Sequence, residues 1–140
     1  MAKVSAKGAV ISLDDSAGTP RAISTYVKSY EIEQDAGKIE MTGFTDGMVN
    51  YIPGLPVYGV TLDLYWDAVT ADVASFTVLR GIFGSSTSKT LSITPESGGP
   101  AFSGEFMLDA LPVKGTPNGS IDIGTVHFSP MGTVAPTFTS

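Results

Sequence analysis

Polar and apolar residues alternate along several short stretches of the chain, which predicts a protein built mainly of β-strands. In the clearest stretch, 59–66, the residues Val60, Leu62 and Leu64 share one face and the residues between them share the other. Further strand-like stretches lie at 9–13, 91–93, 102–109 and 120–129. Each such strand buries one face and exposes the other, so we expect one all-β domain over 1–140 with a β-sandwich or barrel-like arrangement.

Two further alternating stretches, 27–34 and 38–42, flank the small and acidic residues Asp35-Ala36-Gly37. In the second stretch Ile39 and Met41 share one face. Turn-forming residues between two strand-like stretches are typical of a β-hairpin. We therefore expect an antiparallel hairpin with its turn at 35–37.

The segment 43–58 breaks the alternation and is predicted to be a long loop between strands. It contains the turn pairs Asp46-Gly47 and Pro53-Gly54, and Pro56 cannot donate a hydrogen bond to a sheet. Half of its residues are apolar, which is more than a solvated loop needs. A long apolar loop favours a partner surface, although the loop can instead fold back over its own domain.

Apolar residues recur at steps of three and four between 68 and 83, which predicts the one amphipathic helix of the chain, ended by Gly84. Asn118-Gly119 is a strong hairpin-turn signal that leads into the last strand. The apolar face changes parity along that strand, so we expect a bulge near Gly124-Thr125. The segments 1–8 and 130–140 are predicted to be arms.

Composition excludes several classes of protein. The chain has 8 Lys+Arg against 14 Asp+Glu, a formal charge of −6, one histidine and no cysteine. Disulfide frameworks, thiolate metal sites and thiol nucleophiles are therefore ruled out. We expect a soluble protein made in the cytoplasm, with no membrane partner, because no apolar stretch has the length of a signal peptide or a membrane span. The acidic balance argues against binding nucleic acid through its phosphates.

Catalytic motifs are incomplete in this sequence. Residues 84–90 resemble a phosphate-binding loop but lack its second glycine and leave a helix instead of entering one. His127 lies in a strand without a nucleophile elbow, and one histidine provides no metal-ligand spacing to test. A carbohydrate site on Tyr65 and Trp66 is an alternative, but the mid-strand position of Trp66 favours its burial. We expect no catalytic, metal or cofactor site, and no enzyme.

Four segments between 27 and 67 follow one another in a familiar order: VKSYEIEQDA, IEMTGFTDG, YIPGL and VTLDLYWD. This order and spacing resemble the tail tube, or major tail, proteins of long-tailed (siphovirus-type) bacteriophages. The similarity covers about 27–83, and the C-terminal half agrees only in its strand pattern. The resemblance implies a β-sandwich with one flanking helix that assembles into hexameric rings. The rings would stack into a hollow tube in the virion and conduct DNA, with other tail proteins at the tube ends.

The resemblance also implies that the 43–58 segment and the arms contact the neighbouring ring. The residues expected at this interface are Phe44, Asp46, Met48, Tyr51, Ile52, Pro53, Leu55 and Tyr58. Acidic residues on the polar faces of strands are expected to line the lumen, although alternation alone fits exposure to bulk solvent equally well: Glu31, Glu33, Glu105 and Asp109. A capsid decoration or head-tail joining protein is the alternative function.

The opposite faces of the strands are expected to form the core together with the helix. The expected core residues are Tyr30, Ile32, Leu62, Leu64, Trp66, Phe76, Leu79, Phe102, Phe106 and Leu108.

Overall fold

The computed structural model describes residues 8–67, 75–96, 98–119 and 121–139. In chain order its elements are β1 (Val10–Asp14), β2 (Pro20–Ala22), the 3-10 helix η2 (Ser24–Tyr26), β3 (Val27–Glu40), β4 (Tyr51–Tyr65), α1 (Ser75–Ile82), β5 (Lys89–Thr94), β6 (Phe102–Ala110), β7 (Val113–Lys114), β8 (Asp122–Pro130) and β9 (Thr137–Phe138).

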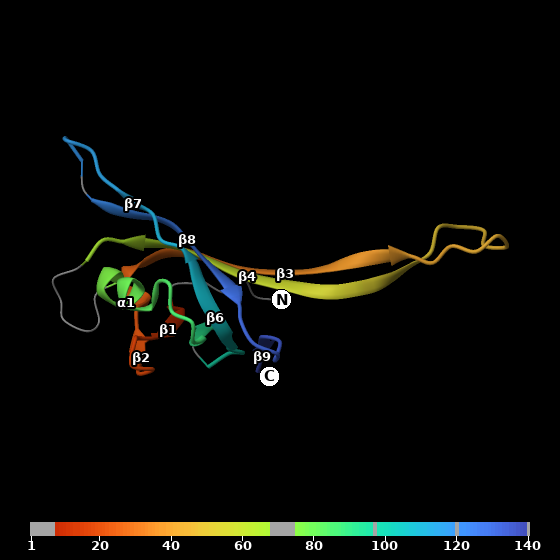
Figure 1. Ribbon diagram of the computed structural model, residues 1–140, viewed down its shortest axis with the longest axis horizontal. Helices are drawn as coiled ribbons and strands as arrows, with labels where there is room; N and C mark the ends of the chain where they lie inside the picture. The colour runs from red at the N-terminus through yellow and green to blue at the C-terminus, as the bar shows by residue number, and fades with distance from the viewer. Residues whose placement is uncertain (1–7, 68–74, 97, 120, 140) are drawn as a thin grey trace.

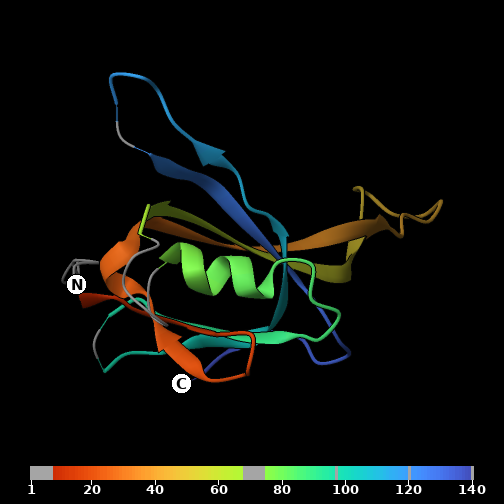
Figure 2. The same ribbon diagram turned by 60° about the vertical axis from the view of Figure 1, so that its left-hand side comes forward.

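All of these strands belong to one antiparallel sheet. Its order is β2-β1-β5-β6-β8-β4-β3, while β7 pairs with β8 and β9 pairs with β6. The sheet curves so that β3 and β4 lie on one side of α1 while β1 and β5 lie on the other (Figure 2). The predicted all-β domain with a single helix is confirmed, and its two layers are parts of one continuous sheet.

The hydrophobic core fills the space between the curved sheet and α1. Of the residues expected there, six are buried and four are partly buried and packed against them. The buried six are Leu62, Leu64, Leu79, Phe102, Phe106 and Leu108, and the other four are Tyr30, Ile32, Trp66 and Phe76. The rings of Trp66 and Phe76 lie 4.4 Å apart, which joins the end of β4 to the helix. Burial of each large apolar side chain contributes about 1.5–3 kcal/mol to folding.

The hairpin predicted with its turn at 35–37 is wrong. Residues 27–40 form one continuous strand of 14 residues, β3, whose partner is β4. Asp35 and Ala36 pair with Val57 and Pro56, and only a register shift beside Gly37 marks the expected turn. A long partner strand supplies ladder hydrogen bonds that outweigh the turn propensity of three residues.

The loop predicted at 43–58 is also shorter than expected, because β4 begins at Tyr51. The loop between β3 and β4 covers only 41–50. Pro53 and Pro56 fit within β4 because β8 pairs with that strand only between Val60 and Tyr65. This part of β4 therefore has a second edge on which a missing N–H breaks no ladder hydrogen bond.

The remaining local predictions fare better. The helix is described from Ser75 to Ile82, and the expected positions 68–74 lie outside the described residues. Gly84 has φ 78°, a left-handed conformation that ends the helix as predicted. The bulge in β8 is confirmed, since Asp63 and Leu64 pair with Thr125 and Ile123 and skip Gly124.

The turn at Asn118-Gly119 and the C-terminal arm differ from their predictions. The N–H of Gly119 donates to the carbonyl of Thr116 at 3.1 Å, so Pro117 and Asn118 are the central turn residues. In the expected C-terminal arm, β9 pairs with β6 and the rings of Phe138 and Phe102 lie 5.1 Å apart. That part of the arm lies against its own sheet. Residues 1–7 of the expected N-terminal arm lie outside the described residues.

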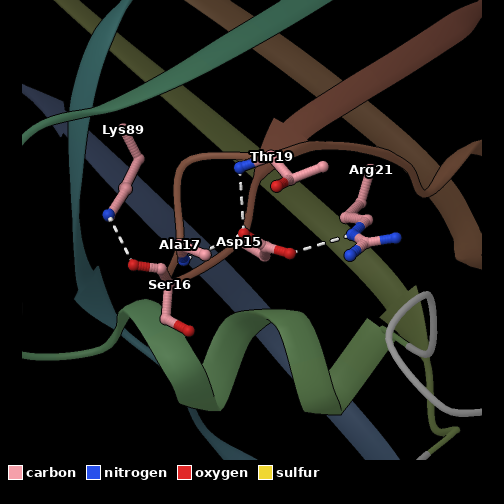
Figure 3. Close-up of polar contacts among 6 residues, drawn as sticks. All are labelled: Asp15, Ser16, Ala17, Thr19, Arg21 and Lys89. Atoms are coloured by element: carbon pink, nitrogen blue, oxygen red, sulfur yellow. Dashed lines mark hydrogen bonds and ion pairs between the residues drawn. The ribbon is translucent and has the colours of Figure 1, made fainter.

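The turn between β1 and β2 is organised by the carboxylate of Asp15 (Figure 3). Its oxygens accept hydrogen bonds from the N–H groups of Ala17 and Thr19 at 2.9 and 3.0 Å, and from Nε of Arg21 at 2.9 Å. The Thr19 N–H, then the Arg21 side chain, hold the pKa of Asp15 below its ordinary value of 3.8.

We expect Asp15→Asn to lower stability at neutral pH and to make little difference in strong acid. A folded-state pKa below the unfolded value stabilises the fold above that unfolded value, and the gain is lost as pH falls through the folded pKa. Urea unfolding of both proteins from pH 7 down to pH 2 measures the difference. A gap between the two proteins that stays constant across this range would contradict the assignment.

Lys89 is the one buried charged side chain among the described residues, with 8% of its surface exposed. It begins β5 on the core face, in line with Leu91 and Ile93. Its Nζ donates to the carbonyl of Ser16 at 3.3 Å, which links β5 to the β1–β2 turn (Figure 3). The side chain therefore packs its methylene groups in the core while its charge reaches a backbone acceptor.

Lys89→Ala is expected to destabilise the fold by roughly 1–3 kcal/mol, because it removes buried methylene groups and a hydrogen-bond donor to a backbone carbonyl. Lys114→Ala is the matched control, since Lys114 is exposed on β7 and should change stability by less than about 0.5 kcal/mol. Urea midpoints of the two variants give the comparison. Equal midpoints would mean that the burial of Lys89 contributes nothing.

Candidate assembly surface

The distal parts of β3 and β4, together with the loop between them, form an arm that projects from the body of the domain (Figure 1). We define this arm as residues 34–58. Its two strands pair with each other, and β3 is the last strand of the sheet. The neighbouring strand β8 accompanies β4 only from Val60 onward. Within the described part of the chain, no third strand supports the arm.

The arm is apolar in spite of its exposure. Phe44 is 111% exposed, Leu55 90% and Met48 71%. Six more large apolar residues of the arm are 44–65% exposed: Ile39, Met41, Val49, Tyr51, Ile52 and Val57. A monomeric protein rarely exposes a contiguous apolar surface of this kind, which is typical of an interaction site.

The tip loop, 41–50, has a defined conformation. A carboxylate oxygen of Asp46 accepts the N–H of Gly43 at 2.6 Å, and Oγ1 of Thr42 accepts the N–H of Asn50 at 3.0 Å. The Gly43 N–H, followed by the Asn50 side chain, lowers the pKa of Asp46, so the tip carries a negative charge at neutral pH. The tip is thus a shaped surface with apolar side chains around one carboxylate.

A bulge bends the arm between its two halves. Gly54 and Leu55 of β4 lie opposite Gly37 of β3, where the register shifts by one residue. A Cβ on Gly54 would lie 3.2 Å from the carbonyl oxygen of Gly37, so the close approach of the two strands favours glycine there. Beyond the bulge, Nζ of Lys38 lies 4.4 Å from the ring centre of Tyr51.

The residues predicted at the interface therefore fall into three positions. Phe44, Asp46 and Met48 lie in the tip loop, while the distal part of β4 contains Tyr51, Ile52, Pro53 and Leu55. The tip and the distal strand do not fold back over the body, in contrast to the alternative considered from the sequence. Tyr58 differs, because it is partly buried against the core.

The predicted interface omitted four exposed apolar residues of the arm: Ile39, Met41, Val49 and Val57. The shared face of Ile39 and Met41 was visible in the alternating pattern of residues 38–42, but neither residue was assigned to the core or to the interface. Both are more than half exposed, at 52% and 58%. Alternation shows that two side chains share a face, and it does not show what covers that face.

The four acidic residues expected in the lumen lie on one face of the sheet, the face away from α1. On β3, Glu31 pairs with Thr61, which in turn pairs with His127 of β8. Glu33 follows at the next position on the same face. On β6, Glu105 pairs with Thr90, and Asp109 reaches His127. We call this surface the polar face.

Hydrogen bonds between neighbouring strands hold several of these carboxylates in place. Asp109 accepts from Oγ of Ser129 at 2.8 Å and lies 2.8 Å from Nδ1 of His127. Glu105 accepts hydrogen bonds from the hydroxyls of Ser88 and Thr90. Each carboxylate is thus fixed by hydroxyl groups on adjacent strands and stays on the surface of the sheet.

The pKa of Asp109 reflects two opposing influences. Partial burial raises the pKa, but hydrogen bonds with His127 and Ser129 outweigh it and hold the pKa below 3.8. Asp109 is therefore ionised at neutral pH. His127, which was considered from the sequence as a possible catalytic or metal-binding residue, here orients a carboxylate.

Two further acidic residues belong to the polar face and were not predicted. Asp63 accepts hydrogen bonds from Ser29 at 3.1 Å and from Thr125 at 2.9 Å, which joins β3, β4 and β8. Asp14 accepts the N–H of Thr90 at 3.3 Å. The alternation of residues 59–66 had placed Asp63 on the polar side of its strand, so its position was available from the pattern.

Two kinds of feature are missing from the part of the chain that the structure describes: a cluster of metal ligands and a helix able to span a membrane. No group of three or more His, Asp or Glu side chains is placed there to hold a metal ion. No helix among residues 8–67, 75–96, 98–119 and 121–139 is long and apolar enough to cross a membrane.

No protein-family model matches the chain, and no curated protein does. Among solved structures, it is similar to a chain in the tail of an empty gene transfer agent particle, determined with helical refinement in C6 symmetry. The TM-score is 0.79 at 18% identity, over 99% of this chain and 100% of that one. A chain in the virion of the native gene transfer agent particle gives 0.78 at 17% identity, over 99% and 100%.

A more distant structure, a chain of the sixfold-symmetrised baseplate of the anti-feeding prophage, has a TM-score of 0.64 at 11% identity. The match covers 99% of this chain and 96% of that one. At identities this low, the similarity shows a shared fold. Each match covers 99% of this chain and therefore includes the arm.

Proposed function

We propose that this chain is the structural subunit of a phage-type tail tube, in which copies form hexameric rings that stack into a hollow tube. The observation that carries this proposal is the arm, which exposes nine large apolar side chains that its own domain does not cover. Burial of these side chains against other copies supplies the free energy of assembly.

The similar structures support this proposal at the level of architecture. They come from a tail, a virion and a baseplate, and the tail and the baseplate are described with sixfold symmetry. A ring of six and a location in a virion tail are therefore the assembly and location that we propose for this chain. The siphovirus type of tail, suggested by the sequence resemblance, stays a prediction.

The polar face supports a role as the wall of a channel. Glu31, Glu33, Glu105 and Asp109 lie together with hydroxyl residues on one side of the sheet, opposite the core. A ring of six chains with a charge of −6 each has a net charge of about −36. If the polar face lines the lumen, its carboxylates place part of that negative charge on the wall of the channel. DNA carries about one negative charge per 1.7 Å of duplex, so an acidic wall repels it and lets it slide.

A structural role also fits the absence of a complete catalytic motif in the sequence. Asp109 and His127 form a pair, but the sequence contains no nucleophile elbow that would present a catalytic serine to them. The contacts of Ser129 and His127 with Asp109 are explained by a structural role, because they hold that carboxylate on the polar face.

Electron microscopy of the purified protein tests the proposal directly. The expected result is tubes with a hollow core and sixfold rings in cross-section. Isolated trimers would instead favour a capsid decoration protein, and single rings that do not stack would favour a head-tail joining or baseplate component. A protein that stays monomeric at high concentration would contradict all three functions.

A further inference from the structure

A hollow of about 630 Å³ lies beside the start of β3 and has no role in the function proposed above. Its lining includes the apolar residues Ile11, Val27 and Tyr30, with Lys28 and Ser29 beside them. A volume of this size is within the range of pockets that enclose a small ligand or several side chains, roughly 300–1,000 Å³.

The hollow is built from elements that hydrogen bonds tie together. Oγ of Ser24 in η2 accepts the N–H of Ile11 in β1 at 2.8 Å and donates to the Ile11 carbonyl at 3.3 Å. The N–H of Ile23 also donates to that carbonyl, at 3.0 Å. The shape of the hollow therefore exists before any partner binds, which lowers the entropic cost of docking.

The strand β3 runs from the body of the domain out to the tip of the arm (Figure 1). The hollow adjoins the first residues of β3, and the tip follows its last residue, Glu40. Ten residues of strand separate Tyr30 from Glu40, a distance of roughly 33 Å. A chain cannot place its own tip in its own hollow, because the paired strands of the arm hold the two apart.

The chemistry of the tip matches that of the hollow. The tip presents Phe44, whose side chain is fully exposed, next to the negative charge of Asp46. The hollow offers apolar walls, and Lys28 belongs to its lining with its Nζ 4.8 Å from the ring centre of Tyr65, so a positive charge lies near the hollow. An aromatic side chain that fills a pocket, next to a charge pair, is the usual composition of an interface hot spot.

We propose that the tip loop of one copy seats Phe44 in the hollow at the start of β3 of a second copy, with Asp46 near Lys28. This proposal rests on the proposed function, since it assigns the contact between successive copies. Donor and acceptor surfaces at opposite ends of a subunit make a head-to-tail contact, which extends into an open polymer when it joins copies in successive rings.

Cysteine cross-linking tests this contact, because the chain has no cysteine of its own. One chain carries Thr45→Cys in the tip, which leaves Phe44 in place, and a second chain carries Ala9→Cys at the hollow. The two are mixed, allowed to assemble and treated with a mild thiol oxidant. A disulfide-linked dimer containing one chain of each kind is expected. Phe83→Cys, on an exposed apolar residue outside the tip and both terminal segments, replaces Thr45→Cys in the control and should give no such dimer.

Two additional substitutions test the chemistry of the contact. Adding Phe44→Ser to the Thr45→Cys chain should lower the yield of the mixed dimer at least tenfold. Adding Lys28→Gln to the Ala9→Cys chain should also lower the yield, while Lys114→Gln should leave it unchanged. Unaltered yields with Phe44→Ser would overturn the assignment of Phe44.

Failure of this proposal is distinguishable from failure of the proposed function. Tubes that form in electron micrographs without the mixed dimer would overturn the docking of the tip and leave the tube intact. Dimers formed only between two chains that both carry Thr45→Cys would also overturn it, because the tips would then meet each other. If the unsubstituted protein formed no tubes, both the proposed function and the proposed docking of the tip loop would be overturned.

Discussion

Replacing both Tyr51 and Leu55 by serine is expected to leave a folded chain that no longer forms tubes. These side chains are 51% and 90% exposed in the single chain, so their loss changes little within the domain. In an assembly, each would bury apolar surface worth about 1.5–3 kcal/mol. Loss of both raises the concentration needed for assembly by a factor of about 100 or more.

Sedimentation and electron microscopy across a range of concentrations measure this effect, and circular dichroism checks that the variant is folded. The control removes exposed apolar side chains elsewhere, with Phe83→Ser and Val113→Ser, which are 55% and 49% exposed outside the arm and the terminal segments. We expect the control to assemble as the unsubstituted protein does. If the arm variant assembled at the same concentration as the control, the arm would have no part in assembly.

Reversing the charge of Glu31 and Glu33 to lysine is expected to convert a tube that repels DNA into one that retains it. Each substitution raises the net charge of a chain by two units, so the two together raise the net charge of a ring of six by about 24 units. Lysines on the wall of the lumen would bind phosphates and release counterions, which makes retention strongly dependent on salt. We expect at least tenfold more DNA bound at about 50 mM than at about 200 mM salt.

Co-sedimentation of short duplex DNA with preformed tubes measures retention. The matched comparison uses the single variants Glu33→Lys and Glu96→Lys, because Glu96 lies in the turn after β5, beyond the strands that form the polar face. Only the Glu33 variant should increase salt-dependent retention. Equal retention by both would show that the total charge of the particle matters and that the polar face does not line the channel.

Local features of the fold were predictable because their causes lie within a few residues. Gly84 ends the helix with a positive φ that glycine adopts without strain, and the skipped residue Gly124 was visible as a change of parity along β8. The same holds for the buried face of β4 at Leu62 and Leu64, which follows from alternation alone.

The candidate surfaces were predictable only in part. Alternation placed Glu31 and Glu33 on a polar face, but it required the pairing of β3, β4, β6 and β8 to bring Glu105 and Asp109 onto that same face. The apolar residues at 43–58 indicated a partner surface, yet nothing in their pattern indicated that half of the segment continues a strand. The hollow beside β3 combines residues from β1, η2 and β3 and has no local signature.

The alternation of side chains was enough to identify an all-β domain, its single helix and an unusual apolar segment, because these depend on spacing along the chain. Tertiary structure decided that Asp35-Ala36-Gly37 stays extended and that Pro53 and Pro56 lie within a strand. The physical reason is that pairing is a property of two segments. A turn-forming triplet remains a strand when a long partner supplies its hydrogen bonds, and a proline is tolerated in a strand when the edge that it faces is free.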